Sequence, residues 1–332
     1  MSLLFVDGWD HYALSDLLKK WSSGSANVLG AGGRRSTNCL TMYGNTSLTK
    51  NLSAAQASLI AGFAFQFPSA LGQPFFAFRD NGSTQVDFIV NNNGSISVRR
   101  GASTVLGTTA LALVSMGSYF YFEAKVVFHA SAGSVIIHLN GSEVLNISSV
   151  NTIATANATA DQITLNTGLQ TLMFDDLYVC NLLGSINNNF LGDCRVDSLF
   201  PTSDGNYAQF TCSTGSSHFT LVDETTPNTT DYNSDATVGH RDSYGYSDLP
   251  ALTTQNIYGV QVCQASTKSD AGAKSTANFV RTGTTNSDSA AMVMTATSQL
   301  YYLSIFETDP TTAVAWTESG INGMEAGVKV AA

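Results

Sequence analysis

Residues 171–181, which read TLMFDDLYVCN, constrain the fold more than any other stretch of the chain. Their nearly continuous apolar and aromatic side chains are typical of a β-strand that is covered on both faces. Only Asp175 and Asp176 interrupt the run. Because successive side chains of a strand point to opposite faces, we expect these two carboxylates on opposite faces, and at least one requires a partner. The strand is predicted to close a first sandwich.

Short apolar segments precede this strand at the spacing of an antiparallel sandwich, with turn residues between them. Asn140-Gly141 is the strongest turn signal, because both residues tolerate the positive φ angles of a type I′ hairpin. Together these segments predict an all-β jelly-roll sandwich with few helices. The expected strands are 59–67, 74–78, 85–90, 95–99, 103–106, 119–128, 134–139, 142–147, 162–165 and 172–179.

Two short helices are expected near the chain ends. Apolar residues Leu14, Leu17, Leu18 and Trp21 recur at helical spacing, which predicts an amphipathic helix whose polar side carries Asp16, Lys19 and Lys20. Near the other end, Trp316, Ile321 and Met324 form an apolar edge of a second helix. Thr317 is expected to cap that helix and Gly327 to end it.

The pattern of residue types along the chain changes after Asn181. This change predicts two domains, residues 1–183 and 184–332. The second domain is expected to be β-rich, with five or six strands and the short C-terminal helix. Its strands include residues 207–211, 218–222, 257–265 and 300–306. Residues 223–246 read as a long polar loop, and loops of this length usually have a function or are ordered by a neighbour.

Composition excludes several classes of protein. The net charge is -10 and only 12% of residues are charged, so the protein's own field opposes binding to nucleic acid. The five cysteines are odd in number and form no CxxC pair, which argues against a disulfide framework. No apolar run approaches the roughly 20 residues of a membrane helix. The first residues lack the pattern of a signal peptide, so we expect synthesis in a reducing cytoplasm.

Four signatures carry a family resemblance: FVDGWDHY at 5–12, FDDLYV at 174–179, FLGDCRVDSLFPTSDGNY at 190–207 and DPTTAVAWTESGINGMEAGVKV at 309–330. Together they resemble tailed-bacteriophage structural proteins built on a laminin-G or concanavalin-like jelly roll. The resemblance implies a virion protein that assembles in the host bacterial cytoplasm with other virion proteins and with copies of itself. Within that class we favour a tail-tip, baseplate or fibre component. The alternatives are a capsid decoration protein and a lectin-like module that binds host surface glycans.

Catalysis is not expected. Glycosidases on concanavalin-like sandwiches place paired carboxylates about 5 Å apart across one bond, whereas Glu123 is the only acidic residue of its predicted strand. The five histidines are solitary, so their spacing does not indicate a zinc site. We therefore predict a protein that is not an enzyme and has no cofactor other than a weakly indicated calcium ion.

The calcium candidates are Asp7, Asp10, Asp175 and Asp176, because the resemblance brings their segments together and calcium prefers carboxylate oxygens. The alternative, which we favour, is that these aspartates accept backbone N–H bonds or pair with His11 or Lys20.

Aromatic and apolar residues of the second domain are the candidates for binding. Tyr232, Tyr244 and Tyr246 lie in the predicted polar loop beside Asp and Asn residues that accept hydrogen bonds from sugar hydroxyls. The same tyrosines also suit a subunit interface, where tyrosine is enriched. Trp316 and Met324 are expected to dock the terminal helix on a neighbouring subunit or on the second domain itself.

Overall fold

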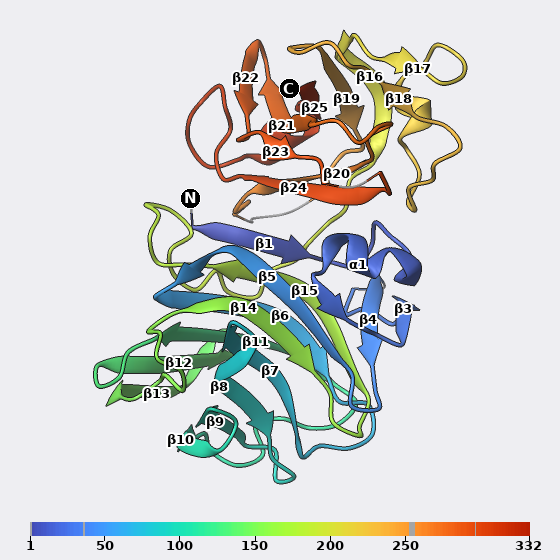
Figure 1. The fold of residues 1–332 in the computed structure, drawn as a ribbon. Coiled ribbons are helices and arrows are strands. Elements are labelled where there is room, and N and C mark those ends of the chain that lie inside the picture. The colour runs from blue at the N-terminus through green and yellow to red at the C-terminus, as the bar shows by residue number, and fades with distance from the viewer. Residues whose placement is uncertain (1, 36, 252–255, 296) are drawn as a thin grey trace. The chain divides into compact units, whose positions relative to one another are not determined.

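The computed structural model describes residues 2–35, 37–251, 256–295 and 297–332 and confirms the all-β fold class (Figure 1). The chain forms two compact units, Met1–Val196 and Asp197–Ala332. The sequence placed the boundary at residue 183 instead. The difference arises because residues 184–196 return to the first unit, where Gly192 and Val196 donate backbone hydrogen bonds to its side chains.

The first unit is a sandwich of two antiparallel sheets. The first sheet consists, in spatial order, of β13 (Ser142–Val150), β12 (Gly133–Leu139), β11 (Tyr119–Val127), β6 (Ser58–Gln66), β15 (Leu172–Cys180), β4 (Asn38–Met42) and β3 (Val28–Ala31), with β1 (Leu3–Asp7) also paired to β15. The second sheet consists of β10 (Thr104–Thr108), β9 (Ile96–Arg100), β8 (Ser83–Val90), β7 (Gln73–Asp80), β14 (Ala160–Asn166), β5 (Ser47–Gln56) and β2 (Ser23–Gly24).

Phenylalanines fill the space between these two sheets. The ring of Phe122 on β11 lies 5.4 Å from that of Phe63 on β6 and 5.2 Å from that of Phe88 on β8. All three side chains are fully buried. Such tilted and edge-on ring pairs add roughly 0.5–1.5 kcal/mol each beyond the burial of their area. The predicted strands of this unit are present, and Asn140 and Gly141 adopt φ angles of 51° and 78°, as a type I′ hairpin requires.

The N-terminal helix is shorter than its apolar pattern predicts. A 3₁₀ turn (Leu14–Asp16) leads into α1 (Leu17–Lys20), and the chain becomes extended at Trp21. Lys20, expected on the polar side, is only 3% exposed, whereas Leu18 is 53% exposed. The expectation was wrong because a helix of one turn does not keep the periodic stripe, and because Lys20 has a buried partner in Asp7.

The second unit is built on an antiparallel sheet. In spatial order the sheet contains β16 (Pro201–Ala208), β19 (Arg241–Tyr246), β25 (Glu325–Val330), β21 (Ser275–Thr282) and β22 (Thr285–Asp288), with β23 (Met292–Val293) on β21. Two further pairs are β20 (Val260–Ser266) with β24 (Leu300–Phe306) and β17 (Thr211–Cys212) with β18 (Asn233–Ser234). Its apolar core consists of Val262, Val280, Phe306, Trp316, Ile321, Met324 and Ala326.

Local predictions were less accurate in the second unit. Residues 218–222 form a 3₁₀ turn (Phe219–Leu221) where a strand was expected, and the predicted loop 223–246 ends in strand β19. The helix α2 (Glu318–Asn322) is capped by Thr317 as expected, since Gly320 N donates to Thr317 Oγ1 over 3.0 Å. It ends at Gly323, before Gly327, which lies in β25 so close to the Asp242 carbonyl that a Cβ would clash.

Candidate functional site

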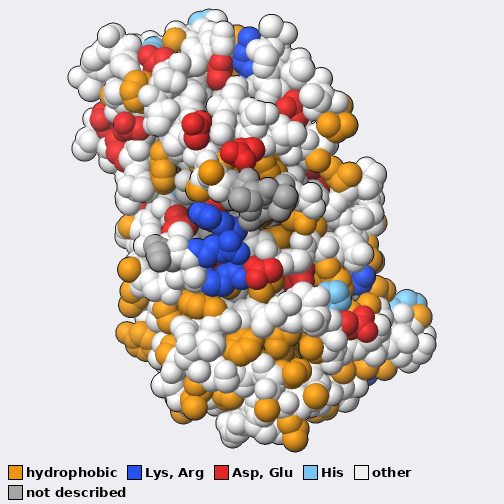
Figure 2. Space-filling model, turned by 180° about the vertical axis from the view of Figure 1, so that it is seen from behind, with side chains coloured by type: hydrophobic (Ala, Val, Ile, Leu, Met, Phe, Trp, Pro, Cys, Tyr) orange, Lys and Arg blue, Asp and Glu red, His pale blue; other side chains and the backbone are white. Residues whose placement is uncertain are grey.

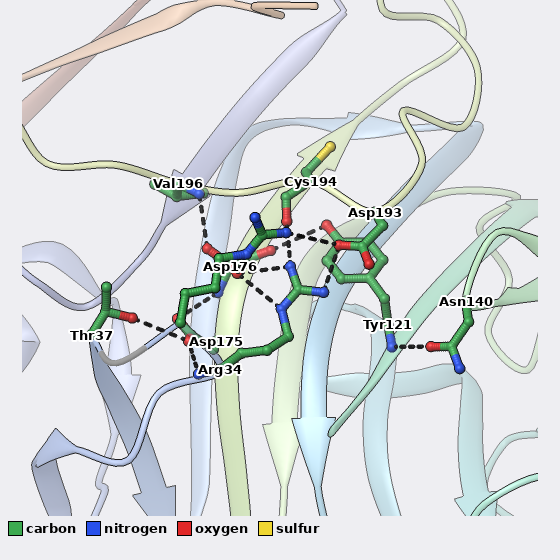
Figure 3. Close-up of polar contacts among 10 residues, drawn as sticks. Arg34, Thr37, Tyr121, Asn140, Asp175, Asp176, Asp193, Cys194 and Val196 are labelled. Atoms are coloured by element: carbon green, nitrogen blue, oxygen red, sulfur yellow. Dashed lines mark hydrogen bonds and ion pairs between the residues drawn. The ribbon is translucent and has the colours of Figure 1, made fainter. Parts of the chain in front are cut away.

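A polar cluster of the first unit lies on the outer face of its first sheet, where Asp175 and Asp176 occupy a β-bulge of β15 (Figure 3). Asp176 has a φ of 53°, and the pairing of β15 with β6 shifts between Asp175 and Tyr178. A bulge interrupts the alternation of side chains. Both carboxylates therefore reach one residue, Arg34, and the expectation that they occupy opposite faces was wrong.

Arg34 joins three separate parts of the first unit. Its Nη2 lies 2.9 Å from Asp176 Oδ2 and 2.7 Å from the Cys194 carbonyl oxygen, and its Nη1 lies 2.5 Å from Asp193 Oδ1. Its backbone N–H donates to Asp175 Oδ2 over 2.8 Å. The guanidinium also lies over the Tyr121 ring, 5.0 Å from the centroid. Figure 2 shows a patch of Lys and Arg side chains near the middle of the view, with carboxylates beside it.

The electrostatics of this cluster follow from burial and charge. Burial and the neighbouring Asp176 raise the pKa of Asp175 to about 7. Burial by itself lowers the pKa of Arg34, but Asp193 and Asp176 outweigh it and raise that pKa above its usual value. The guanidinium consequently stays charged and holds the neighbouring carboxylates.

An extended stretch, which we call the 190–196 segment, lies across this face. Leu191 N donates to the Tyr178 hydroxyl over 3.2 Å, and Gly192 N donates to Glu123 Oε1 over 2.8 Å. Farther along, Val196 N donates to Asp176 Oδ1 over 2.8 Å. At its start, the Phe190 ring stacks on His138 at a centroid distance of 4.0 Å. The segment therefore covers the polar side chains of the sheet.

Glu123 is the most buried acid beneath the segment. It is fully buried and its Oε1 accepts the Tyr178 hydroxyl over 2.5 Å. Its Oε2 has no hydrogen-bond partner among the described residues, and the nearest cation-forming group is His138 Nδ1 at 4.0 Å. Glycoside hydrolysis requires two carboxylates that flank a bond in a groove. This arrangement instead offers one covered acid and aspartates held by Arg34.

The calcium candidates have protein partners. Asp7 is fully buried and accepts from Lys20 Nζ at 2.9 Å, Tyr12 Oη at 2.7 Å and Trp21 Nε1 at 2.8 Å. Asp10 accepts from Asn38 N over 2.8 Å, while Asp175 and Asp176 bind Arg34. Within the described ranges, no three His, Cys, Asp or Glu side chains are grouped so as to hold a metal ion.

Titration in the Asp7 cluster follows from its burial. Burial raises the pKa of Asp7, but the charge of Lys20 and the hydrogen bonds from Tyr12 and Lys20 outweigh this effect, so the pKa lies below its usual value. Burial together with Lys20 lowers the pKa of His11 to about 3. The cluster therefore contains a charged Asp7–Lys20 pair beside a neutral imidazole at neutral pH.

Only one of the predicted binding tyrosines presents its ring to solvent. Tyr232 is 52% exposed, whereas Tyr244 is buried and donates its hydroxyl to Asp242 Oδ2 over 2.9 Å. Tyr246 packs against the apolar core of the second unit. Tyr244 and Tyr246 lie in strand β19, which pairs with β25. The prediction that they are loop residues was therefore wrong.

Trp316 and Met324 belong to the interior of the second unit. They are 3% and 6% exposed, and Trp316 Nε1 donates to the Phe306 carbonyl oxygen over 2.9 Å. Of the two docking sites expected for them, the structure places them in the second unit itself. Their side chains are not available to a neighbouring subunit in this structure.

Sequence reasoning missed the residues that organise the outer face. Arg34 lies in none of the four signatures, and Asp193 lies within the FLGDC stretch without any sign of its role. The unpartnered Asp175-Asp176 pair was the available signal, because it required a cation from elsewhere in the chain. Nothing local to Arg34 identifies it as that cation.

Comparisons with known proteins were made for the whole chain. No family model and no curated protein matches it. Similar solved structures include Cip1, a cellulose-induced protein (13% identity, 49% of this chain and 91% of that chain, TM-score 0.38). Others are domain 4 of the arabinanase AbnA from Geobacillus stearothermophilus with arabinotriose (13%, 54% and 92%, 0.40) and the carbohydrate-binding module CBM66 from Bacillus subtilis (11%, 49% and 96%, 0.34). These likenesses concern the fold alone.

Among the described residues, no helix is long and apolar enough to cross a membrane.

Proposed function

We propose that this chain is a non-enzymatic structural subunit of a tailed-phage virion, associated with the tail, and that it assembles with other virion proteins in the host bacterial cytoplasm. One observation carries the proposal: the acidic residues on the outer face of the sandwich bind Arg34 and the chain's own 190–196 segment. Groups that an enzyme would direct at a substrate are used here to hold the chain together.

The contacts of this cluster join distant parts of the sequence. Asp193 and Asp176 lie 159 and 142 positions from Arg34. Removing one partner of a buried ion pair typically costs about 3–5 kcal/mol, because the other charge is left buried. Such contacts between distant parts of the sequence suit a protein that must keep its folded shape under mechanical load, as a structural component of a particle must.

The family signatures contain residues that form the stabilising contacts described above. FVDGWDHY supplies Asp7, FDDLYV supplies Asp176, and the FLGDC stretch supplies Asp193. The terminal signature supplies Trp316 and Met324 to the core of the second unit. The resemblance to phage structural proteins thus rests on residues that determine architecture, which supports a structural role.

The test is gold labelling of purified phage particles with an antibody raised against this chain, with particles lacking its gene as the control. Label at the tail or its tip is the expected result. Label spread over the head would indicate a capsid decoration protein instead. Particles that carry no label would refute the virion proposal.

A second candidate function is recognition of a host surface glycan, and the exposed Tyr232 favours it. The turn before this tyrosine is held in place, since Asn228 Oδ1 accepts from Thr230 N over 2.6 Å and from Asp231 N over 3.2 Å. An exposed aromatic ring that follows an ordered turn with amide and carboxylate groups suits a sugar ring. On a glycan array, Tyr232→Ala should abolish binding, whereas Tyr43→Ala, an exposed tyrosine of the first unit, should not.

A further inference from the structure

The loops at one end of the first sandwich converge because its strands are antiparallel. Met42 pairs with Leu172 and Gln66 with Tyr119, while Gln73 pairs with Val90. The connections that follow or precede these residues therefore lie at one end. We call this surface the uncharged end; it consists of residues 25–27, 43–46, 67–72, 91–95, 109–118, 140–141 and 167–171.

None of these loops contains Asp, Glu, Lys, Arg or His, although the chain has a net charge of -10. Their residues are mostly Asn, Ser, Thr, Gly, Ala and Leu. Charged groups of the same unit lie elsewhere, for example Arg34, Arg35 and Asp193, which form ion pairs on the outer face of the first sheet. The lower end of the first unit in Figure 2 is mostly orange and white.

Large apolar side chains are exposed on this end. Leu169 is 79% exposed, Leu111 66%, Met116 54% and Tyr43 46%. Depletion of charge together with exposed aromatic residues and methionine is the composition that distinguishes the centre of a protein interface from ordinary surface. These residues come from different loops, so the feature arises only in the folded chain.

Hydrogen bonds between the loops hold the uncharged end in shape. Asn45 N donates to the Gly168 carbonyl over 2.6 Å, Gly117 N to Phe67 O over 2.9 Å, and Ala112 N to Asn93 O over 2.9 Å. A surface that is already ordered loses less conformational entropy when it binds. The uncharged end therefore loses little conformational entropy when it binds another surface.

We propose that the uncharged end binds the same end of a second copy of this chain. Two chains of charge -10 repel each other over most of their surfaces. At the uncharged end, two copies can meet without stripping water from charged groups. A two-fold contact brings the same patch of both copies together, and this patch contains no like charges that would repel. This inference deepens the proposed function by naming the surface through which copies assemble.

Sedimentation velocity of the full chain over a range of concentrations tests the proposal. Wild type should form a dimer that dissociates on dilution. Leu169→Glu and Met116→Glu should each weaken dimerisation at least about tenfold, because each buries an unpaired carboxylate in the contact. Leu183→Glu is the matched control, since Leu183 is also 79% exposed but follows β15 instead of preceding it. It should dimerise like wild type.

A wild type that stays monomeric at every concentration would overturn the inference. So would a dimer that Leu169→Glu and Met116→Glu disturb no more than Leu183→Glu does. Circular dichroism of each variant distinguishes loss of folding from loss of dimerisation. Because there are two separate variants, the test still holds if one of them does not fold. The outcome is separable from the virion proposal, because gold label on particles is independent of whether the isolated chain dimerises.

Discussion

Arg34 and Asp176 lie 142 positions apart in the chain and form a 2.9 Å ion pair on the outer face of the first sheet. The arginine side chain is 14% exposed and that of the aspartate 5%. The same guanidinium holds Asp193 and the Cys194 carbonyl. The Arg34 side chain thus links three regions: the loop between β3 and β4, the bulge of β15 and the 190–196 segment.

Replacing Arg34 should destabilise the first unit strongly. Arg34→Ala leaves Asp176 buried without its cation, so we expect a loss of roughly 3 kcal/mol in the free energy of unfolding, measured in urea. Arg35→Ala is the control, because Arg35 is 34% exposed and its closest approach to Asp176 is 3.9 Å. It should cost less than about 1 kcal/mol. Equal losses in the two variants would contradict the role assigned to Arg34.

The Asp7–Lys20 pair should behave as a coupled unit. Lys20→Met leaves the Asp7 carboxylate fully buried without its ammonium and should cost roughly 3–5 kcal/mol. The double variant Asp7→Asn with Lys20→Met should lose much less than the sum of the single losses, because it leaves no buried charge. Lys19→Met, which affects only a partly exposed pair with Asp16, should be nearly neutral. Additive losses in urea unfolding would disprove the coupling.

Asp175 should make stability fall as pH rises. Its pKa is raised from 3.8 to about 7 in the folded protein, so between these values the folded state holds a proton that the unfolded state has lost. Stability therefore decreases through this window, by up to about 1.4 kcal/mol per pH unit, and levels off above pH 7.

The Asp175→Asn variant isolates this contribution. Unfolding free energies of wild type and variant should be compared at intervals from pH 4 to pH 8. The difference should shift in favour of the variant up to about pH 7 and then stay constant, since asparagine does not titrate. Parallel profiles would mean that Asp175 titrates normally.

Trp316 should affect stability and leave assembly unchanged. Trp316→Ala removes a large side chain from the core of the second unit and breaks its bond to the Phe306 carbonyl, so we expect a loss of about 3–5 kcal/mol. Val314→Ala, at a 60% exposed position nearby in sequence, should have little effect. Differential scanning calorimetry measures both. A variant that melts like wild type but no longer assembles would show that Trp316 serves an interface instead.

The sequence by itself determined the all-β class, most strands of the first unit and the Asn140-Gly141 hairpin. These features depend on interactions between residues close together in the chain: alternation along a strand, or the φ preferences of two turn residues. The cap of α2 by Thr317 was predictable for the same reason, since donor and acceptor are three positions apart.

Only the tertiary structure decided where the charged and aromatic side chains lie. The bulge at Asp176 set both aspartates toward Arg34, and the partner in Asp7 drew Lys20 into the interior. Pairing of β19 with β25 buried Tyr244, and antiparallel register brought uncharged loops from across the first unit to one end. Each outcome depends on a partner at least 13 positions away in the chain. The free energy of such a contact is not encoded in the pattern of either segment alone.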